Sequence, residues 1–133
     1  MILTVKTAAQ TELVDITEQV GRAVADSGVR EGLCLLFVPH TTAAVTINES
    51  ADPSVRTDIL MVLNQMVPWK AGYRHAEGNS PAHVKASLMG ASETILVENG
   101  TLVLGTWQGI FFCEFDGPRS RKVHLRVVES RLR

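Results

Sequence analysis

The chain has little of what would indicate an unusual class of protein. Its 133 residues include two cysteines, too few for a disulfide framework to replace a hydrophobic core. Charged residues make up 20% and the net charge is -1, so there is no basic excess of the kind that binds nucleic acid. Nucleic acid is therefore not an expected partner.

Long apolar runs are also missing. No stretch approaches the ~20 apolar residues of a membrane span, so we expect no membrane association. Residues 1–15 combine neither the basic nor the apolar segment of a signal peptide, and we expect a cytoplasmic protein. In that setting Cys34 and Cys113, both within apolar runs, are predicted to be buried free thiols.

What is present predicts one domain over residues 1–133, with strands and helices alternating along the chain. Asp52-Pro53 and Ser80-Pro81 each place a capping residue before a proline, which is typical of a helix start. A third helix precedes Gly28, where apolar residues recur at helical spacing. Strands are predicted at 2–7, 11–16, 33–39, 43–48 and on both sides of residue 100.

Three features of the strands decide the fold class. Asn99-Gly100 suits a tight hairpin turn, because both residues tolerate positive φ. Val123, Leu125 and Val127 alternate with polar residues, which predicts a strand with one apolar face. The run 33–39 is apolar throughout, which predicts a strand buried on both faces. Hairpin strands with helices between them favour an α+β fold with a largely antiparallel sheet.

Histidines are the first candidates for chemistry. His75, Asn79 and His83 recur at every fourth position from a polar loop into a helix, and His40 follows a predicted buried strand. Three neutral imidazoles with one open position form the ligand set of a catalytic zinc site. The spacing of His75 and His83 matches no standard zinc motif, so surface or helix-capping roles stay open as alternatives.

Other polar residues offer weaker signals. Glu49 follows a strand and is a candidate for acid–base work or for magnesium binding. Asp58 is either catalytic or part of a solvated helix face, and the hydroxyls of Thr41 and Thr42 either hold a phosphate or belong to an ordinary turn.

The later part of the chain adds two more candidates. Trp107 and Gln108 interrupt a strand and are candidates for lining a pocket, although burial of Trp107 in the core is slightly favoured. Arg119 and Arg121 have the geometry to grip a phosphate or a carboxylate with two hydrogen bonds. The alternative for this basic C-terminal stretch is a solvated strand face.

Five blocks of sequence resemble the YjbQ-like family, whose members carry the name secondary thiamine-phosphate synthase. The resemblance extends from about residue 3 to residue 129. The five blocks are, in order, PHTTAAVTINE at 39–49, DPSVRTD at 52–58, HAEGNSPAH at 75–83, SETILVENGTLVLGTWQGI at 92–110 and EFDGPR at 114–119.

The resemblance implies a strand-rich, largely antiparallel pseudo-barrel or sandwich with about three helices packed outside, assembled as a homotrimer. It implies a divalent metal, zinc or magnesium, on His40, His75 and His83. It also implies a polar cleft that holds these histidines, with Glu49, Asn79, Gln108 and Asp58 nearby. Together with the candidates above, we expect Glu49, Asp58 and His83 to be catalytic and Thr41, Thr42, Asn48, Asn79, Gln108 and Arg119 to bind the ligand.

The reaction implied by the family name joins a pyrimidine pyrophosphate to a thiazole phosphate and releases pyrophosphate. Magnesium on carboxylates is the usual clamp for such a leaving group, and three histidines suit that task poorly. Two alternatives therefore stay open. One is a metal-dependent hydrolase or lyase acting on a small phosphorylated metabolite, with Glu49 as general base; the other is a non-catalytic trimer that binds a metabolite or a metal.

Overall fold

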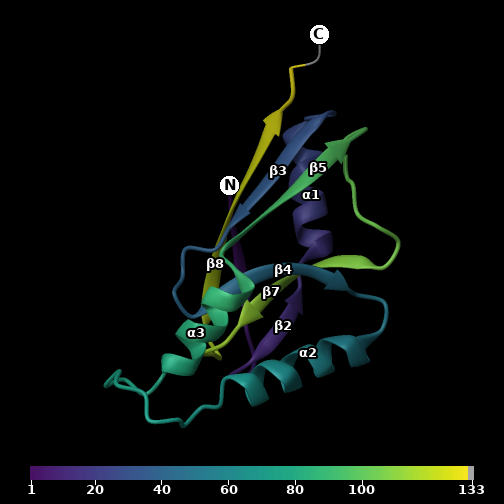
Figure 1. The fold of residues 1–133 in the computed structure, drawn as a ribbon. Coiled ribbons are helices and arrows are strands. Elements are labelled where there is room, and N and C mark those ends of the chain that lie inside the picture. Colours follow the sequence, from purple (N-terminus) through teal and green to yellow (C-terminus); the bar gives the residue numbers. More distant parts are fainter. Residues whose placement is uncertain (132–133) are drawn as a thin grey trace.

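The computed structural model describes residues 1–131, which form an α+β domain of two antiparallel sheets and three helices (Figure 1). The predicted fold class is confirmed. The larger sheet has the order β1 (Ile2–Lys6), β8 (Ser120–Glu129), β3 (Gly32–Phe37), β5 (Ser92–Glu98) and β6 (Thr101–Leu102). The smaller sheet has the order β2 (Glu12–Asp15), β7 (Gln108–Glu114) and β4 (Ala43–Glu49). Together the sheets curl into a half-barrel.

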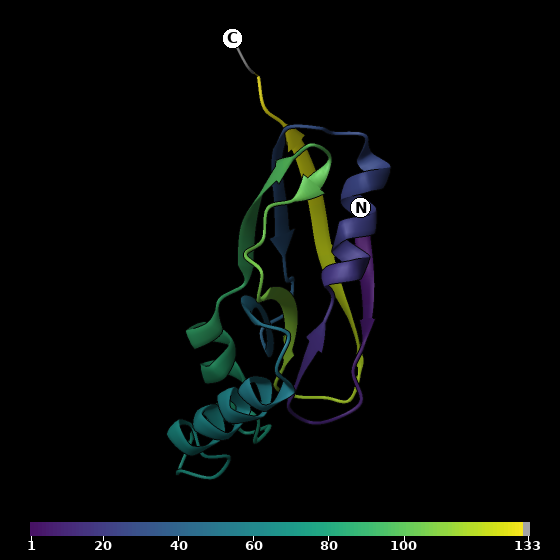
Figure 2. The ribbon, with the colours of Figure 1, turned by 90° about the vertical axis from the view of Figure 1, so that its right-hand side faces the viewer.

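The helices begin and end where local signals predicted. They are α1 (Thr17–Ser27), α2 (Pro53–Met66) and α3 (Ser80–Met89). The Asp52 carboxylate caps α2 by accepting a hydrogen bond of 2.9 Å from the Ser54 amide. Figure 2 places α1 at one end of the molecule and α2 with α3 at the other. Within the described residues, no helix is both long and apolar enough to cross a membrane.

The core consists of two clusters on either side of the smaller sheet, because the side chains of β7 alternate. Ile110 and Phe112 face the larger sheet and α1. Phe111 and Cys113 face the opposite way, into a cluster that includes residues of α2 and α3. Cys34 lies in the first cluster, so both thiols are buried and free, as predicted.

Two of the predicted strand features are confirmed and one is wrong. Asn99 and Gly100 have φ of 54° and 76° in the turn between β5 and β6. In β8, Val123 and Leu125 are buried and their polar neighbours are exposed. By contrast, β3 is buried on one face only.

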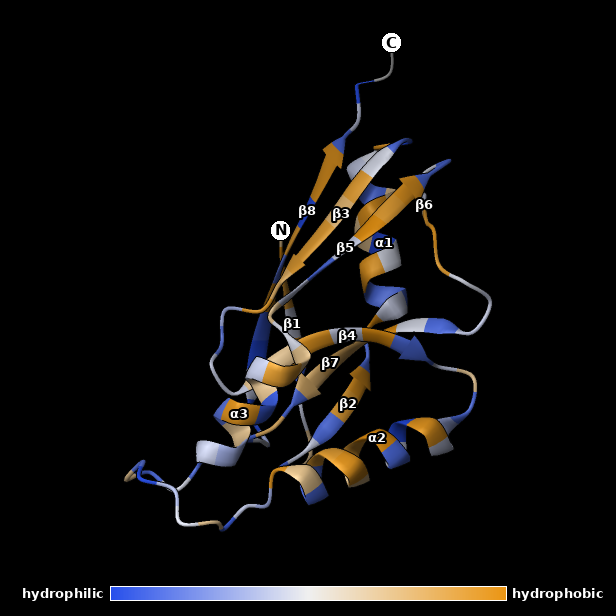
Figure 3. Ribbon diagram, viewed as in Figure 1, coloured by the Kyte–Doolittle hydropathy of each residue, from blue (hydrophilic) through white to orange (hydrophobic). Residues whose placement is uncertain are grey.

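The outer face of β3 exposes Leu33, Leu35 and Phe37 by 42%, 42% and 48%. Leu96 of β5 and Val128 of β8 pair with Leu33 and extend this apolar face, and Figure 3 shows the hydrophobic colour across β3, β5 and β8. Burial on both faces requires cover on both sides of a sheet. Within residues 1–131, α1 covers the inner face and no helix covers the outer one.

A buried ion pair joins the two sheets. Glu114 ends β7 and is 0% exposed, and Arg121 lies near the start of β8 and is 3% exposed. Arg121 Nε donates to both carboxylate oxygens of Glu114, at 2.9 and 3.1 Å, and its Nη2 contacts one of them as well. Arg121 thus binds a carboxylate of its own chain with several hydrogen bonds. A solvated position is wrong for Arg121, whereas Lys122 and Arg126 of the same stretch are exposed.

Further hydrogen bonds complete the environment of this pair. Thr7 Oγ1 donates to Glu114 at 2.7 Å, and Arg121 Nη2 donates to Thr42 Oγ1 at 2.8 Å. Burial by itself raises the pKa of Glu114, but the hydrogen bonds from Arg121, Thr7 and the Asp116 amide, with the charge of Arg121, outweigh it. The pKa of Glu114 is therefore below its ordinary value, and the carboxylate is ionised in the folded protein.

Replacing one partner of this pair is expected to destabilise the fold strongly. Arg121→Met leaves the Glu114 charge buried without a cation, and the expected loss in the free energy of unfolding is about 3–5 kcal/mol. Urea denaturation measures this loss. The matched control is the double variant Glu114→Gln/Arg121→Met, which leaves no buried charge and should lose less than the single variant. Equal losses in the two proteins would contradict the role given to the charge.

Candidate functional site

A polar cavity of about 480 Å³ opens beside the ion pair, and we call it the histidine cleft. It brings together the three predicted histidines with four of the predicted ligand-binding residues. Its lining residues are Pro39, His40, Thr41, Thr42, His75, Glu77, Asn79, His83, Asp116, Arg119 and Arg121.

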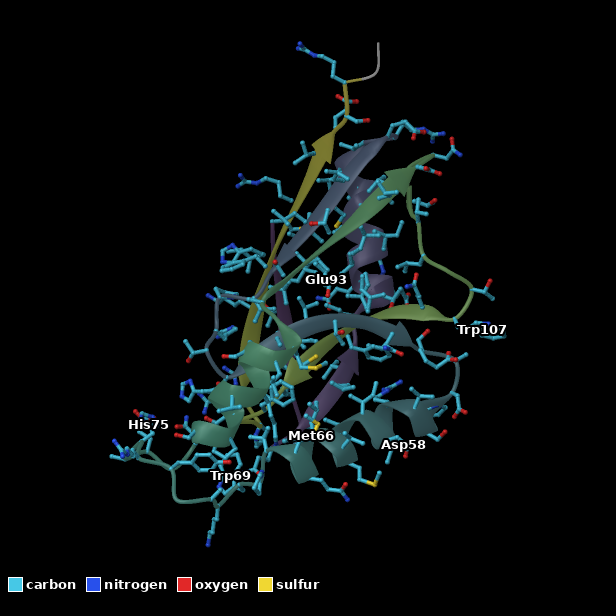
Figure 4. All side chains as sticks on the ribbon, in the orientation of Figure 1. Asp58, Met66, Trp69, His75, Glu93 and Trp107 are labelled. Carbon is cyan, nitrogen blue, oxygen red and sulfur yellow. The ribbon has the colours of Figure 1, made fainter. Side chains whose placement is uncertain are left out.

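Three stretches that are distant in the sequence supply this lining, residues 39–42, 75–83 and 116–121. His40 lies in the turn between β3 and β4, and His75 lies in the loop between α2 and α3. His83 belongs to the first turn of α3, and Asp116 and Arg119 belong to the turn between β7 and β8. Figure 4 shows His75 on the loop beside the N-terminal end of α3.

His40 is fixed in one tautomer. Its Nε2 accepts a hydrogen bond of 2.9 Å from the backbone amide of Lys122. A nitrogen that accepts a hydrogen bond carries no proton, so the neutral ring has its hydrogen on Nδ1. Burial, followed by the positive charge of Arg121, lowers the pKa of His40 below its ordinary value. His40 is thus held neutral and offers one N–H donor.

The other two histidines contact each other. The rings of His75 and His83 meet edge to face, with centroids 5.4 Å apart and planes at 88°. Glu77 Oε2 lies 3.9 Å from His75 Nε2. A pair of imidazoles on one side of a cavity, one of them beside a carboxylate, is suited to moving protons to and from a bound molecule.

Asp116 ties the start of α3 to the turn before β8. Its Oδ2 accepts hydrogen bonds from Asn79 Nδ2 at 2.9 Å and from Arg119 Nη2 at 3.2 Å. Because the carboxylate is an acceptor, the Asn79 amide presents its NH₂ group to it and its oxygen elsewhere. That oxygen, Oδ1, is buried and has no hydrogen-bond partner among the described residues.

The three histidines do not form a metal site in this arrangement. Residues 1–131 contain no group of three His, Cys, Asp or Glu side chains placed to hold a metal ion. The Nε2 lone pair of His40 is also already used by the Lys122 amide. The residues as arranged therefore do not fit the expected three-histidine zinc set, and a divalent metal stays an untested prediction.

Four of the predicted site residues lie away from the cleft. Glu49 and Asn48 are at the far end of β4, six residues beyond Ala43, or roughly 20 Å at 3.3 Å per residue. Gln108 pairs with Glu49 at that end, and its Oε1 accepts a hydrogen bond from the Gly105 amide.

Asp58 lies on the exposed side of α2, and Figure 4 shows it and Trp107 on the opposite side of the molecule from His75. Trp107 is 63% exposed, so its predicted burial in the core is wrong.

Two polar lining residues, Glu77 and Asp116, were not singled out from the sequence, and the buried position of Arg121 was not predicted. Asp116 stands in a D-G-P-R turn, and nothing local distinguishes it from an ordinary turn residue. The sequence did contain a signal for Arg121. It is two residues before Val123, so in an extended strand both side chains point to the same, buried face of β8. Extending that alternation by one step predicts that Arg121 points inward.

The stability of the protein is expected to depend on the protonation of His40. The pKa of His40 is lowered on folding. Below about pH 6.5, His40 is therefore protonated to a greater extent in the unfolded chain than in the folded protein. The free energy of unfolding should fall as the pH drops from 6.5 through the folded pKa, and level off below it.

Urea denaturation of the wild type and of His40→Gln between pH 5 and pH 8 measures this effect. The glutamine variant keeps an acceptor near the Lys122 amide but does not titrate, so the part of the slope due to His40 should disappear. Equal slopes in the two proteins would show that His40 is not the group responsible.

Comparison with known proteins gives one consistent result. The family described as UPF0047 protein YjbQ-like matches residues 1–130. The chain is 48% identical over 127 residues to UPF0047 protein YugU of Bacillus subtilis, covering 95% of this chain and 96% of that protein. It is 50% identical over 124 residues to a UPF0047 protein of Methanocaldococcus jannaschii, covering 93% and 90% of the two chains.

Solved structures agree with these relatives. The fold matches the crystal structure of a YjbQ/UPF0047 family protein from Clostridium acetobutylicum with a TM-score of 0.94 and 53% identity, covering 96% of this chain and 99% of that one. It matches a protein from Sulfolobus solfataricus with a TM-score of 0.94 and 39% identity, covering 98% and 96%. The chain therefore belongs to the UPF0047 family of YjbQ-like proteins.

Proposed function

We propose that the protein is an enzyme that binds a small phosphorylated metabolite in the histidine cleft and uses histidines to move protons. The observation that carries this proposal is the meeting of His40, from the turn after β3, with His75 and His83, from the stretch 75–83, in one polar cavity of about 480 Å³. Imidazole is a common general acid and base in enzymes, so imidazoles that line one polar cavity support a role in proton transfer.

The cleft contains donors for a phosphoryl group. The Arg119 side chain is 51% exposed and is the more accessible cation of the cleft, because Arg121 is buried and its Nε and Nη2 donate to Glu114 and Thr42. The N-terminal end of α3 also faces this region, and Asn79 makes no side-chain hydrogen bond that caps it. Backbone N–H groups at a helix start favour an anion. Asp116 offsets part of the Arg119 charge, so we expect only modest affinity for free phosphate.

The histidines divide into two kinds. His40 is held neutral and donates from Nδ1, which suits a positioning role toward a ligand oxygen. His83 sits on a rigid helix and His75 on a loop against it, so this pair is the proposed acid and base. Groups of this type typically contribute a factor of 10² to 10⁴ to a rate.

The narrower activity is that of a thiamine-phosphate synthase, in which pyrophosphate leaves a pyrimidine and a thiazole phosphate replaces it. Phosphoryl-binding donors in the cleft and the family resemblance support this choice. Arg119 and the N–H groups of the histidines would contact the leaving pyrophosphate, and negative charge developing there is best stabilised by fixed donors of this kind.

The synthase activity is tested with purified protein and its two substrates at saturation. Wild-type protein is expected to form thiamine phosphate, and His83→Ala should lower kcat/KM by about 100-fold or more because the proposed acid–base group is lost. His124→Ala is the matched control, since His124 is exposed on the outer face of β8, away from the cleft, and should leave the rate unchanged.

If the wild type forms no product above the His83→Ala background, the synthase activity is wrong. The broader proposal is then decided separately, by whether inorganic phosphate binds the wild type and binds Arg119→Ala more weakly.

A second candidate is a metal-dependent hydrolase or lyase acting on a phosphorylated metabolite. His75, His83 and the nearby Glu77 carboxylate support it, because they are side chains of the types that bind zinc and they lie together in the cleft, although their present positions do not form a metal site. Zinc and magnesium are the proposed metals.

Elemental analysis of protein purified without a histidine tag or a chelator tests the metal. A metal site predicts close to one zinc per chain, lost in His75→Ala and in His83→Ala but retained in His124→Ala. Equal metal content in all of these proteins, or none in folded wild type, would count against the site.

A third candidate is a non-catalytic homotrimer that binds a metabolite. The apolar outer face of β3, β5 and β8 supports self-association, because contiguous exposed apolar surface usually marks an interface. Ligand binding without turnover would favour this candidate over the enzyme, and sedimentation equilibrium determines the number of subunits.

A further inference from the structure

The histidine cleft meets a second cavity, of about 560 Å³, along the length of α3. The two cavities share His40, Thr41 and His83, so these residues stand at their junction. Beyond the junction the second cavity is lined by Ala43, Ala86, Ser87, Gly90 and Ala91, and we call it the small-residue hollow. It contains no charged side chain other than those shared with the cleft.

The walls of the small-residue hollow are held by backbone hydrogen bonds. The Gly90 carbonyl accepts from the Val45 amide at 3.1 Å, and the Ala91 carbonyl accepts from the Val38 amide at 2.8 Å. Ser87 Oγ donates to the His83 carbonyl at 3.0 Å, which turns the hydroxyl back onto its own helix. The hollow is therefore a preformed space of small, weakly polar groups, a kind of surface suited to a compact organic group.

The two cavities differ in the chemistry that they can bind. The histidine cleft offers a guanidinium and imidazole N–H groups, and the small-residue hollow offers methyl groups and backbone. A phosphate or pyrophosphate alone would leave the hollow filled with water, whereas an organic phosphate would occupy both cavities. Small side chains at Ala86, Ser87 and Ala91 leave room that a larger residue would remove.

We propose that the small-residue hollow binds the uncharged, compact ring of an organic phosphate, an inference that rests on the proposed function. The phosphoryl group then lies toward Arg119, and His40 and His83 stand at the bond region that links the two parts. This assignment makes Ser87 and Ala91 specificity-determining residues, which set the size of the organic group that the protein accepts.

The test uses two probes, inorganic phosphate and phenyl phosphate, titrated into the isotope-labelled full chain and followed by amide NMR shifts. Phenyl phosphate should bind wild type on the order of tenfold more tightly than inorganic phosphate, as expected for burial of one ring. Both probes should shift amides near Arg119 and His83, and phenyl phosphate alone should also shift those of Ala86 and Ala91.

Ala91→Phe and Ser87→Phe fill the hollow from two different positions. In either variant, phenyl phosphate should bind no more tightly than inorganic phosphate. The affinity for inorganic phosphate should stay within about twofold of that of the wild type. Leu88→Phe is the matched control, because it adds the same ring to an exposed position of α3 outside both cavities, and it should change neither affinity. Thermal unfolding establishes that each variant is folded.

The outcomes separate this assignment from the proposed function. If inorganic phosphate binds but phenyl phosphate binds no better, or keeps its advantage in both folded phenylalanine variants, the small-residue hollow is not the ring site and phosphoryl binding still stands. If neither probe binds the wild type, both the proposed function and the ring site are overturned.

Discussion

The ion pair between Glu114 and Arg121 is the constraint on which the arrangement of the cleft depends. It is buried, and a buried charge without a partner is strongly unfavourable. Thr7 and Thr42 add hydrogen bonds to it, so the pair holds the end of β1, the start of β4, β7 and β8 in one geometry. The cleft is built on that junction, with Arg121 in its wall and Asp116 and Arg119 in the turn between the two partners.

The Glu114–Arg121 pair also affects two neighbouring residues of the cleft, Arg119 and His40. Since Arg121 is buried and its Nε and Nη2 donate to Glu114 and Thr42, Arg119 is the more exposed cation of the cleft. Burial, and after it the charge of Arg121, lowers the pKa of His40 and favours its neutral form, and the Lys122 amide selects its tautomer. A fixed, neutral His40 beside the edge-to-face pair of His75 and His83 gives the cleft one positioned donor and two groups able to exchange protons.

Features of the fold that depend on neighbouring residues were predictable, while burial of a side chain by segments distant in the sequence was not. The Asp52 cap, the Asn99-Gly100 turn and the alternation in β8 each involve neighbours within a few residues, and each is found as predicted. Burial of Trp107 and of both faces of β3 depends on which other segments lie over them. Trp107 is at the tip of a loop, and the outer face of β3 has no cover from residues 1–131 of its own chain.

The candidate site divides in the same way. Sequence blocks singled out His40, His75, His83, Asn79 and Arg119, which share the cleft, but also Glu49, Asp58 and Gln108, which lie elsewhere. For Glu49 and Gln108 the reason is strand β4, which begins at the cleft and carries Glu49 and its partner Gln108 to the opposite end, whereas Asp58 lies on the exposed side of α2. Residues only six positions apart on an extended strand, such as Ala43 and Glu49, are therefore far apart in space.

The sequence by itself determined where helices and strands begin and end, because capping, turn conformation and periodicity are properties of neighbouring residues. Only the tertiary structure decided which polar side chains meet. Thr7 and Glu114 are 107 positions apart and Thr42 and Arg121 are 79 apart, yet they share one hydrogen-bonded group. Antiparallel pairing and the stacking of two sheets create such contacts, and no local pattern of residues contains them.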